Sequence, residues 1–215
     1  MNEFMDFNKR PDCKKIKENI VMALVNSEKK VELLKTVPNR QFHDLSIIYC
    51  LPINMVRHEI ITNSMAEELD IEEDELYVLS YRNTLRLFPP TIKPLHNVIE
   101  ELAHEIGEPL ELCDEFSIEK GMIYVISNER GHKGAIYMAY DEVIYRLAEK
   151  LDTDLYILPS STHEILALST SGTDAVYLAQ IVNEVNTEFV NPENQLSNKV
   201  YYYDRNLRKL SIASH

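Results

Sequence analysis

The chain has 215 residues, of which 45% are hydrophobic, and its 35 acidic and 22 basic side chains give a net charge of −13. A chain of this length can bury a core without disulfides, and the excess of carboxylates argues against nucleic acid or an anionic membrane as a partner. No segment approaches the roughly 18 to 20 apolar residues of a membrane span, and the first residues lack the apolar region of a signal peptide.

The three cysteines are scattered and form no CxxC pair; they are Cys13, Cys50 and Cys113. An odd, scattered set fits a reducing compartment better than a disulfide framework. We therefore expect a cytoplasmic protein with structural thiols.

Two helices and a hairpin are expected in the N-terminal region. Asp12 can cap a helix whose apolar residues recur at i, i+4, and a short helix follows over residues 28–35. The apolar residues of the first helix are Ile16, Ile20 and Leu24. Residues 45–51 and 56–62 are rich in β-formers and flank a Pro-Ile-Asn turn, which predicts two paired strands.

Two further helices are predicted in the middle of the chain. Asp70 and Glu73 have the spacing of a capping box, and the helix that follows should end at Leu87, before two prolines. Residues 95–106 carry the clearest helical stripe and are followed by a glycine. The stripe consists of Leu95, Val98, Ile99, Leu102, Ala103 and Ile106.

A second hairpin is predicted for residues 122–127 and 134–140, around a loop with turn residues at both ends. Asp141 then caps an amphipathic helix that runs to residue 151. A third strand pair, formed by 155–158 and 164–168, follows around a short polar loop.

An amphipathic helix over 174–189 and a fourth hairpin, formed by 200–203 and 207–212, are predicted for the end of the chain. Short turns join the strands of each pair, and such pairs are antiparallel. We predict an α+β fold in which antiparallel hairpins alternate with amphipathic helices.

Two regions are expected within this fold, 12–106 and 120–212. They form either two domains with a seam at 107–121, where acids, glycine and proline gather, or one compact domain.

Acidic residues cluster in two places. Seven of the nine positions from Glu67 to Glu75 are acidic, and the segment from Pro94 to Glu119 carries eight acids and no lysine or arginine. Such runs are usually solvated faces, but they also suggest an acidic inhibitor that mimics nucleic acid and occupies the groove of a basic protein.

His96, Glu100 and His104 share one face of the 95–106 helix and form a metal-site hypothesis. That face points away from the apolar stripe, where a metal would lack a concave site and supporting hydrogen bonds. We interpret the three residues as a solvated face. No cofactor is predicted, since the five glycines form no phosphate-binding loop either.

The densest polar group in an apolar neighbourhood lies between Leu158 and the strand that follows. Ser160, Ser161, His163 and Glu164 offer a nucleophile, a base and an orienting group for a hydrolase-like reaction. The alternative is that the hydroxyls satisfy backbone groups in a bend and that His163 makes one structural hydrogen bond.

Tyr201, Tyr202 and Tyr203 should alternate between the two faces of the last hairpin. An exposed tyrosine beside an arginine is typical of protein interfaces. Tyr202 and Arg205 are therefore interface candidates, with ordinary cross-strand packing as the alternative.

Two phrases carry a family resemblance, DLYILPSSTHE from Asp154 to Glu164 and VYYYDR from Val200 to Arg205. Together with weaker phrases earlier in the chain, they resemble a family of gut Firmicutes that is known only as a domain of unknown function. The resemblance implies a cytosolic bacterial protein and no particular reaction. Members of that family often carry a further N-terminal region that this chain lacks.

The leading hypothesis is a non-enzymatic intracellular binding or regulatory protein whose partner is a protein. It rests on the segregated charge and on the lack of any cofactor or metal signature in the sequence. The alternatives are a hydrolase-like enzyme that uses His163 with Ser160 or Ser161, and the acidic mimic. Fold alone does not choose among them, because function depends on the site.

Overall fold

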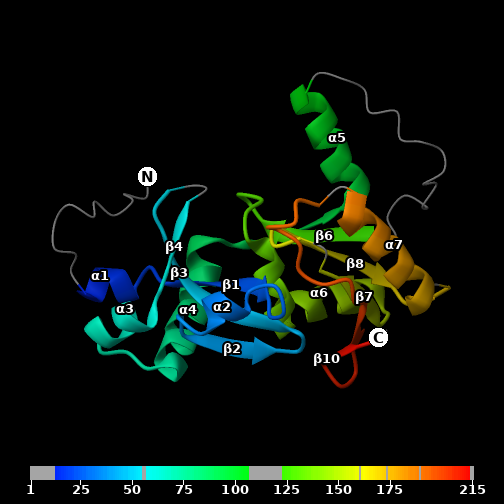
Figure 1. Ribbon diagram of the computed structural model, residues 1–215. Coiled ribbons are helices and arrows are strands. Elements are labelled where there is room, and N and C mark those ends of the chain that lie inside the picture. The colour runs from blue at the N-terminus through cyan, green and yellow to red at the C-terminus, as the bar shows by residue number, and fades with distance from the viewer. Residues whose placement is uncertain are drawn as a thin grey trace.

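The computed structural model describes residues 13–54, 57–106, 123–159, 161–172, 174–188 and 190–213. Within these ranges the chain forms two sheets that lie side by side, with helices around them (Figure 1). Every strand pairing in the described residues is antiparallel. The predicted α+β class, with antiparallel hairpins and helices, is therefore confirmed.

The first sheet has four strands, β1 (Val21–Asn26), β2 (Asn39–Phe42), β3 (Leu45–Pro52) and β4 (His58–Ile60). β3 lies between β1 and β2, and β4 pairs with the last residues of β3. The β3–β4 pair confirms the hairpin that was predicted for this part of the chain. β2 was not predicted, because its four residues are mostly polar and only half-buried.

The predicted helix through Ile16, Ile20 and Leu24 is wrong. Helix α1 (Cys13–Lys17) has only five residues, and the chain then enters β1, whose first five residues are all buried. An apolar run that is buried on both faces of a sheet has no alternating pattern. The helical spacing of the three apolar residues is therefore coincidental, and the run itself is the strand.

Three of the four helices that follow were predicted, and the one over residues 63–68 was not. The segment 28–35 contains the shorter helix α2 (Val31–Leu34), and α3 (Asn63–Glu68) begins with a cap from Thr62. Helices α4 (Glu73–Leu87) and α5 (Leu95–Ile106) have the predicted extents. The capping box is wrong, because Glu72 occupies the N-cap of α4 without a side-chain bond and Asp70 adopts a φ of 48° in the preceding turn.

The second sheet has six strands in the order β10-β9-β7-β8-β6-β5. Their bounds are β5 (Pro90–Pro94), β6 (Ile123–Asn128), β7 (Leu155–Leu158), β8 (Ile165–Ser169), β9 (Tyr201–Asp204) and β10 (Lys209–Ile212). The β7–β8 and β9–β10 pairs confirm the third and fourth predicted hairpins.

The second predicted hairpin is wrong. Residues 134–140 do not form a strand but the 3₁₀ helix η2 (Gly134–Ala139), and β6 pairs with β5 and β8 instead. Five of the six residues of η2 are buried, so the apolar run carries no period that distinguishes helix from strand. Strand β5 went unpredicted because Pro89 and Pro90 were interpreted only as the end of the preceding helix, and proline is uncommon within strands.

Helices α6 (Asp141–Leu151) and α7 (Ala175–Glu188) lie where amphipathic helices were predicted. Asp174 Oδ1 accepts a hydrogen bond of 2.7 Å from the Val176 amide, as expected at a helix start. Asp141 does not cap α6, because Tyr140 holds the N-cap position and no side-chain bond is made there.

The largest hydrophobic core lies between the two sheets. It combines Met22 and Ile47 of the first sheet with Ile126 and Ile157 of the second and with residues of η2 and α6. A second cluster packs on the other face of the first sheet, and a third lies between the second sheet and α7. The division into 12–106 and 120–212 stays a prediction, and its seam at 107–121 lies outside the described residues.

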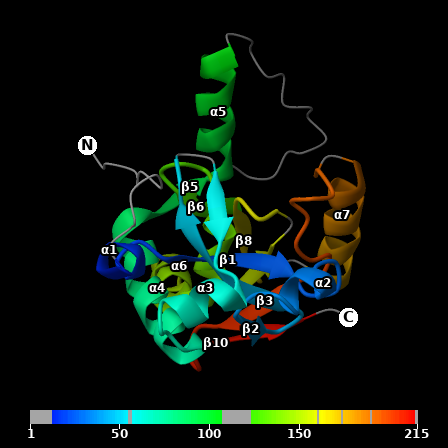
Figure 2. The same cartoon turned by 60° about the vertical axis from the view of Figure 1, so that its left-hand side comes forward.

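Helix α5 extends away from the rest of the molecule in both views (Figures 1 and 2). Its contacts are with β5 and β6, at the edge of the second sheet. None of the side chains described in α5 is fully buried. Helices α5 and α7 lie on one face of the second sheet. α7 covers its middle strands, and α5 lies at its β5–β6 edge.

Candidate functional site

The loop between β7 and β8 carries the polar residues that the sequence singled out. Ser160 lies outside the described residues. Ser161 is buried, and its Oγ accepts a hydrogen bond of 3.0 Å from the amide of His163. Thr162 donates its amide to the backbone oxygen of Asn194. The hydroxyl of Ser161 thus satisfies a backbone group in a bend, as the structural alternative expected.

His163 is held by four hydrogen bonds. Its backbone oxygen accepts from Ser127 Oγ at 2.7 Å and from the Gly134 amide at 2.8 Å. Its amide donates to Ser161, and its Nδ1 accepts from the amide of Lys133 at 3.4 Å. Burial lowers the pKa of the His163 side chain, which keeps the ring neutral.

This arrangement does not favour the serine hydrolase. With the Nδ1 lone pair occupied by an amide, the neutral ring of His163 carries its proton on Nε2. Such a ring can donate a hydrogen bond, but it has no lone pair available to take a proton from Ser161. The two residues are brought together by the loop without forming a nucleophile and base.

Three imidazole rings lie in a row, which we call the histidine row: His58, His132 and His163. The ring centroids of His58 and His132 are 5.1 Å apart and nearly parallel, and those of His132 and His163 are 4.9 Å apart. The row continues to the Phe88 ring, over which the guanidinium of Arg130 lies at 4.6 Å. Because His58 belongs to β4 and the other two to loops of the second sheet, the row joins the two sheets.

A cavity of about 620 Å³ lies over the edge of the second sheet, and we call it the β5–β6 cavity. It is bounded by strands β5 and β6, helix α5, the loop after β6 and the residue before β8. Its lining residues are Thr91, Lys93, Val98, Glu101, Val125, Ser127, Asn128, Glu129, Gly131 and Glu164. Lys93 and Val125 are register partners, so they lie on one face of the sheet.

The charge of the β5–β6 cavity is negative. Lys93 forms an ion pair of 2.7 Å with Glu101, which joins β5 to α5 and neutralises the one cation among the described lining residues. Glu129 and Glu164 have no ion pair with any cation of the described residues. The cavity therefore presents two carboxylates whose charge is not balanced locally.

The loop that bears Glu129 is folded tightly. Asn128 Oδ1 accepts a hydrogen bond of 3.0 Å from the Arg130 amide, and its Nδ2 donates to the backbone oxygen of His132 at 2.9 Å. Gly131 adopts a φ of 59°, which favours glycine, and donates its amide to Asn128. This wall of the cavity is set by the fold before any ligand binds.

The metal hypothesis gains no support from the geometry. Glu100 and His104 are exposed on α5, and His96 is half-buried. Among the residues that the structure describes, no group of three or more His, Cys, Asp or Glu side chains is arranged to hold a metal ion.

Tyr202 and Arg205, the interface candidates, meet at Asp154. Tyr202 Oη donates to Asp154 Oδ2 at 2.6 Å, and the amide of Arg205 donates to Oδ1 at 2.9 Å. The guanidinium of Arg205 pairs with Asp152. Tyr201 and Tyr203 are buried while Tyr202 is half-buried, as the alternation predicted. Both candidates thus have intramolecular partners, and their role in an interface stays a prediction.

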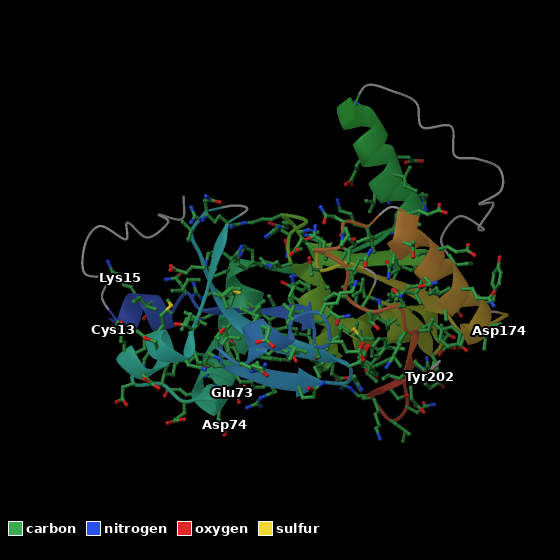
Figure 3. The ribbon with its side chains drawn as sticks, viewed as in Figure 1. Cys13, Lys15, Glu73, Asp74, Asp174 and Tyr202 are labelled. Atoms are coloured by element: carbon green, nitrogen blue, oxygen red, sulfur yellow. The ribbon has the colours of Figure 1, made fainter. Side chains whose placement is uncertain are left out.

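The first acidic cluster is partly neutralised within the fold. Glu73 and Asp74, which lie at the start of α4 (Figure 3), both pair with Arg40. Tyr49 Oη also donates to Glu73, and Lys17 lies 3.6 Å from Glu75. Most of the second cluster lies outside the described residues. The carboxylates of α4 are therefore less available to a basic partner than their number suggests.

Sequence reasoning located Ser161, His163 and Glu164 but missed His58, His132 and the cavity. The sequence predicted only a turn for the residues after β6. Glu164 lies beside them because β8, which it precedes, pairs with β6. No local pattern could connect His58 of the first sheet with His132 of the second.

These features define an acidic α+β protein of two antiparallel sheets, with an open, negatively charged cavity on one of them. The chain belongs to a family of unknown function, DUF5688, whose model matches residues 1–205. No curated protein and no solved structure matches the chain. None of the helices in the described ranges is long and apolar enough to cross a membrane.

Proposed function

We propose that this chain is a non-enzymatic binding protein that accepts a cationic side chain of a partner protein in the β5–β6 cavity. The observation that carries the proposal is the pair of carboxylates, Glu129 and Glu164, that line an open cavity and form no ion pair within the described residues, while the Lys93 of the lining is paired with Glu101. A bacterial, cytosolic setting, which the family resemblance implies, belongs to the same proposal.

A guanidinium fits this lining better than a small ion does. Two carboxylates can each accept charge-assisted hydrogen bonds from one planar guanidinium. Val98 and Val125 offer apolar surface to the methylene stem of an arginine. Thr91 contributes a hydroxyl at the same wall.

Charge and rigidity support binding at this place. The net charge of −13 attracts a basic partner over a longer range than the cavity itself does. The hydrogen bonds of Asn128 fix the loop that bears Glu129, so less conformational entropy is lost on binding.

The proposal is tested by nuclear magnetic resonance titration with N-acetyl-arginine methylamide. We expect saturable shifts of the amides of Ser127, Gly131 and Glu164, with a dissociation constant on the order of 1 to 10 mM for a single side chain. Glu129→Gln and Glu164→Gln should each weaken binding about 5- to 10-fold, since each removes one charge contact.

Glu188→Gln is the matched control, because Glu188 is exposed on α7 and does not line the cavity. It should bind the probe as the unaltered chain does. Equal affinity in all three variants, or no saturable shift around the cavity, would overturn the proposal.

A further inference from the structure

The histidine row occupies the contact between the two sheets. His58 comes from β4 of the first sheet, His132 from the loop that follows β6, and His163 from the loop before β8. The successive ring centroids are 5.1 and 4.9 Å apart. Neutral imidazoles can stack at such distances, whereas two imidazolium ions would repel each other.

The groups around His132 are predominantly cationic or neutral. Lys133 follows it directly, Arg130 lies over Phe88 at the end of the row, and His58 and His163 flank its ring. Burial lowers the pKa of His163, the far ring of the row, and the carboxylate of Glu164 opposes this shift without reversing it. Burial raises the pKa of Cys50 to about 11, although Lys133 lowers it slightly, so this thiol is neutral. Arg57 and Glu59, beside His58 in the chain, are exposed.

The Nε2 atom of His132 is buried and has no hydrogen-bond partner in the described residues. A protonated ring would therefore carry an N–H without an acceptor, in addition to its unbalanced charge. The fold is suited to His132 only in the neutral form.

We infer that the histidine row is a pH-sensitive contact, which holds β4 against the loop 129–133 in neutral solution and separates in mild acid. Proton uptake by His132 places a desolvated charge beside Lys133 and leaves an N–H without an acceptor, so it weakens the stacked contact. The separated rings are hydrated and keep the proton.

The direction follows from the pKa of His132, which burial, His58, Lys133 and His163 lower from 6.5 to about 4. Because the folded pKa lies below the unfolded one, the contact is at full strength above pH 6.5 and weakens as the pH falls from 6.5 to 4. Burial also lowers the pKa of His163, which acts in the same direction.

The consequence for ligand binding rests on the proposed function. Glu129 and Gly131, which line the β5–β6 cavity, belong to the loop that the row holds in place. Acid should therefore loosen one wall of the cavity. The contact itself is measured without any ligand, so failure of the proposed function and failure of this inference are distinguishable.

The test is amide hydrogen exchange of the full chain at about pH 7.5 and 5.0, corrected for the chemical exchange rate. The reporters are the amides of Gly131, Lys133 and Gly134, all hydrogen-bonded in the closed loop. Their opening equilibrium should rise on the order of 10- to 30-fold in acid. The amides of the β7–β8 pair serve as the internal reference and should change less.

His132→Phe keeps a ring in the stack and removes the charge of His132, so its opening equilibrium should rise clearly less than that of the unaltered chain, with the remaining rise due to His163. His96→Gln, on α5 and outside the row, should behave as the unaltered chain. The same rise in His132→Phe, or no rise in the unaltered chain, would overturn the inference.

If His132→Phe does not fold, a second measurement on the unaltered chain tests the inference. The titration midpoint of the His132 ring in the unaltered chain, followed by nuclear magnetic resonance of its carbon-bound protons, should lie well below 6.5. A midpoint at or above that value would contradict the inference.

Discussion

Ser127 Oγ donates a hydrogen bond of 2.7 Å to the backbone oxygen of His163. Ser127 lines the β5–β6 cavity and His163 belongs to the histidine row, so this bond joins the two parts of the site. The same oxygen also accepts from the Gly134 amide. The loops before η2 and before β8 are thus fixed to the end of β6.

Ser127→Ala should lower the free energy of unfolding by about 0.5 to 1.5 kcal/mol, because the partly buried carbonyl of His163 loses one of its two donors. Urea unfolding at neutral pH measures the change. Ser171→Ala, at an exposed serine outside the site, is the control and should change stability by less than about 0.5 kcal/mol. Equal effects in the two variants would contradict the role of the bond.

Of the three glycines that the structure describes, Gly134 tolerates a side chain least. A Cβ there would lie 2.6 Å from Ser127 Cα and 2.7 Å from the His163 oxygen, both of them backbone atoms. Gly134→Ala should cost more than about 3 kcal/mol or prevent folding, because the start of η2 must move away from β6 and from the loop before β8. Gly172→Ala is the comparison: Gly172 has a φ of 76° and open space, so strain alone should cost about 1 kcal/mol. A smaller loss of stability at Gly134 than at Gly172 would contradict the claim that Gly134 has no room for a Cβ between Ser127 and His163.

Ser161 should not act as a nucleophile. We expect Ser161→Ala to lose about 1 kcal/mol of stability, because the His163 amide loses its acceptor. Treatment of the unaltered chain with a fluorophosphonate ester, followed by mass spectrometry of peptides, should give no adduct at Ser161. An adduct that disappears in His163→Gln would revive the hydrolase hypothesis.

Asp154 should contribute to stability except in strong acid. Hydrogen bonds from Tyr202 and from the Arg205 amide lower its pKa below 3.8. A carboxyl whose folded pKa is depressed stabilises the fold above its unfolded pKa, and this contribution is lost as the pH falls through the folded value. Because Asp154 is only partly buried, Asp154→Asn should cost only about 0.5 to 1 kcal/mol near pH 7. The difference between the two chains should shrink as the pH falls below 3.8, and a difference that does not change with pH would contradict the assignment.

The parts of the fold that could be predicted are those with one buried face. α5, α6 and α7 each show a helical stripe, and β9 shows the alternation of its three tyrosines. Apart from the polar, half-buried β2, the strands and the 3₁₀ helix that could not be predicted are buried all round or bounded by proline. β1 and η2 are continuous apolar runs, and β5 is bounded by two prolines. In each case tertiary contacts, rather than the local pattern, decide the conformation.

The candidate site shows the same division. Ser161, His163 and Glu164 were found because they form a dense polar group within an apolar neighbourhood, which is a local signal. Their structural roles depend on Ser127 and Lys133, which reach them only through strand pairing and the turn before η2. The histidine row has no signal in the sequence, because His58 meets the others only when the two sheets pack.

The most direct test of the binding proposal compares N-acetyl-arginine methylamide with its neutral isostere, N-acetyl-citrulline methylamide, on the same sample. The two probes differ in charge and hardly in shape. If Glu129 and Glu164 form the site, the arginine probe should bind at least about 10-fold more tightly at low salt, and the preference should shrink at about 0.5 M salt. Equal dissociation constants for the two probes at low salt would contradict the claim that this cavity recognises a cation.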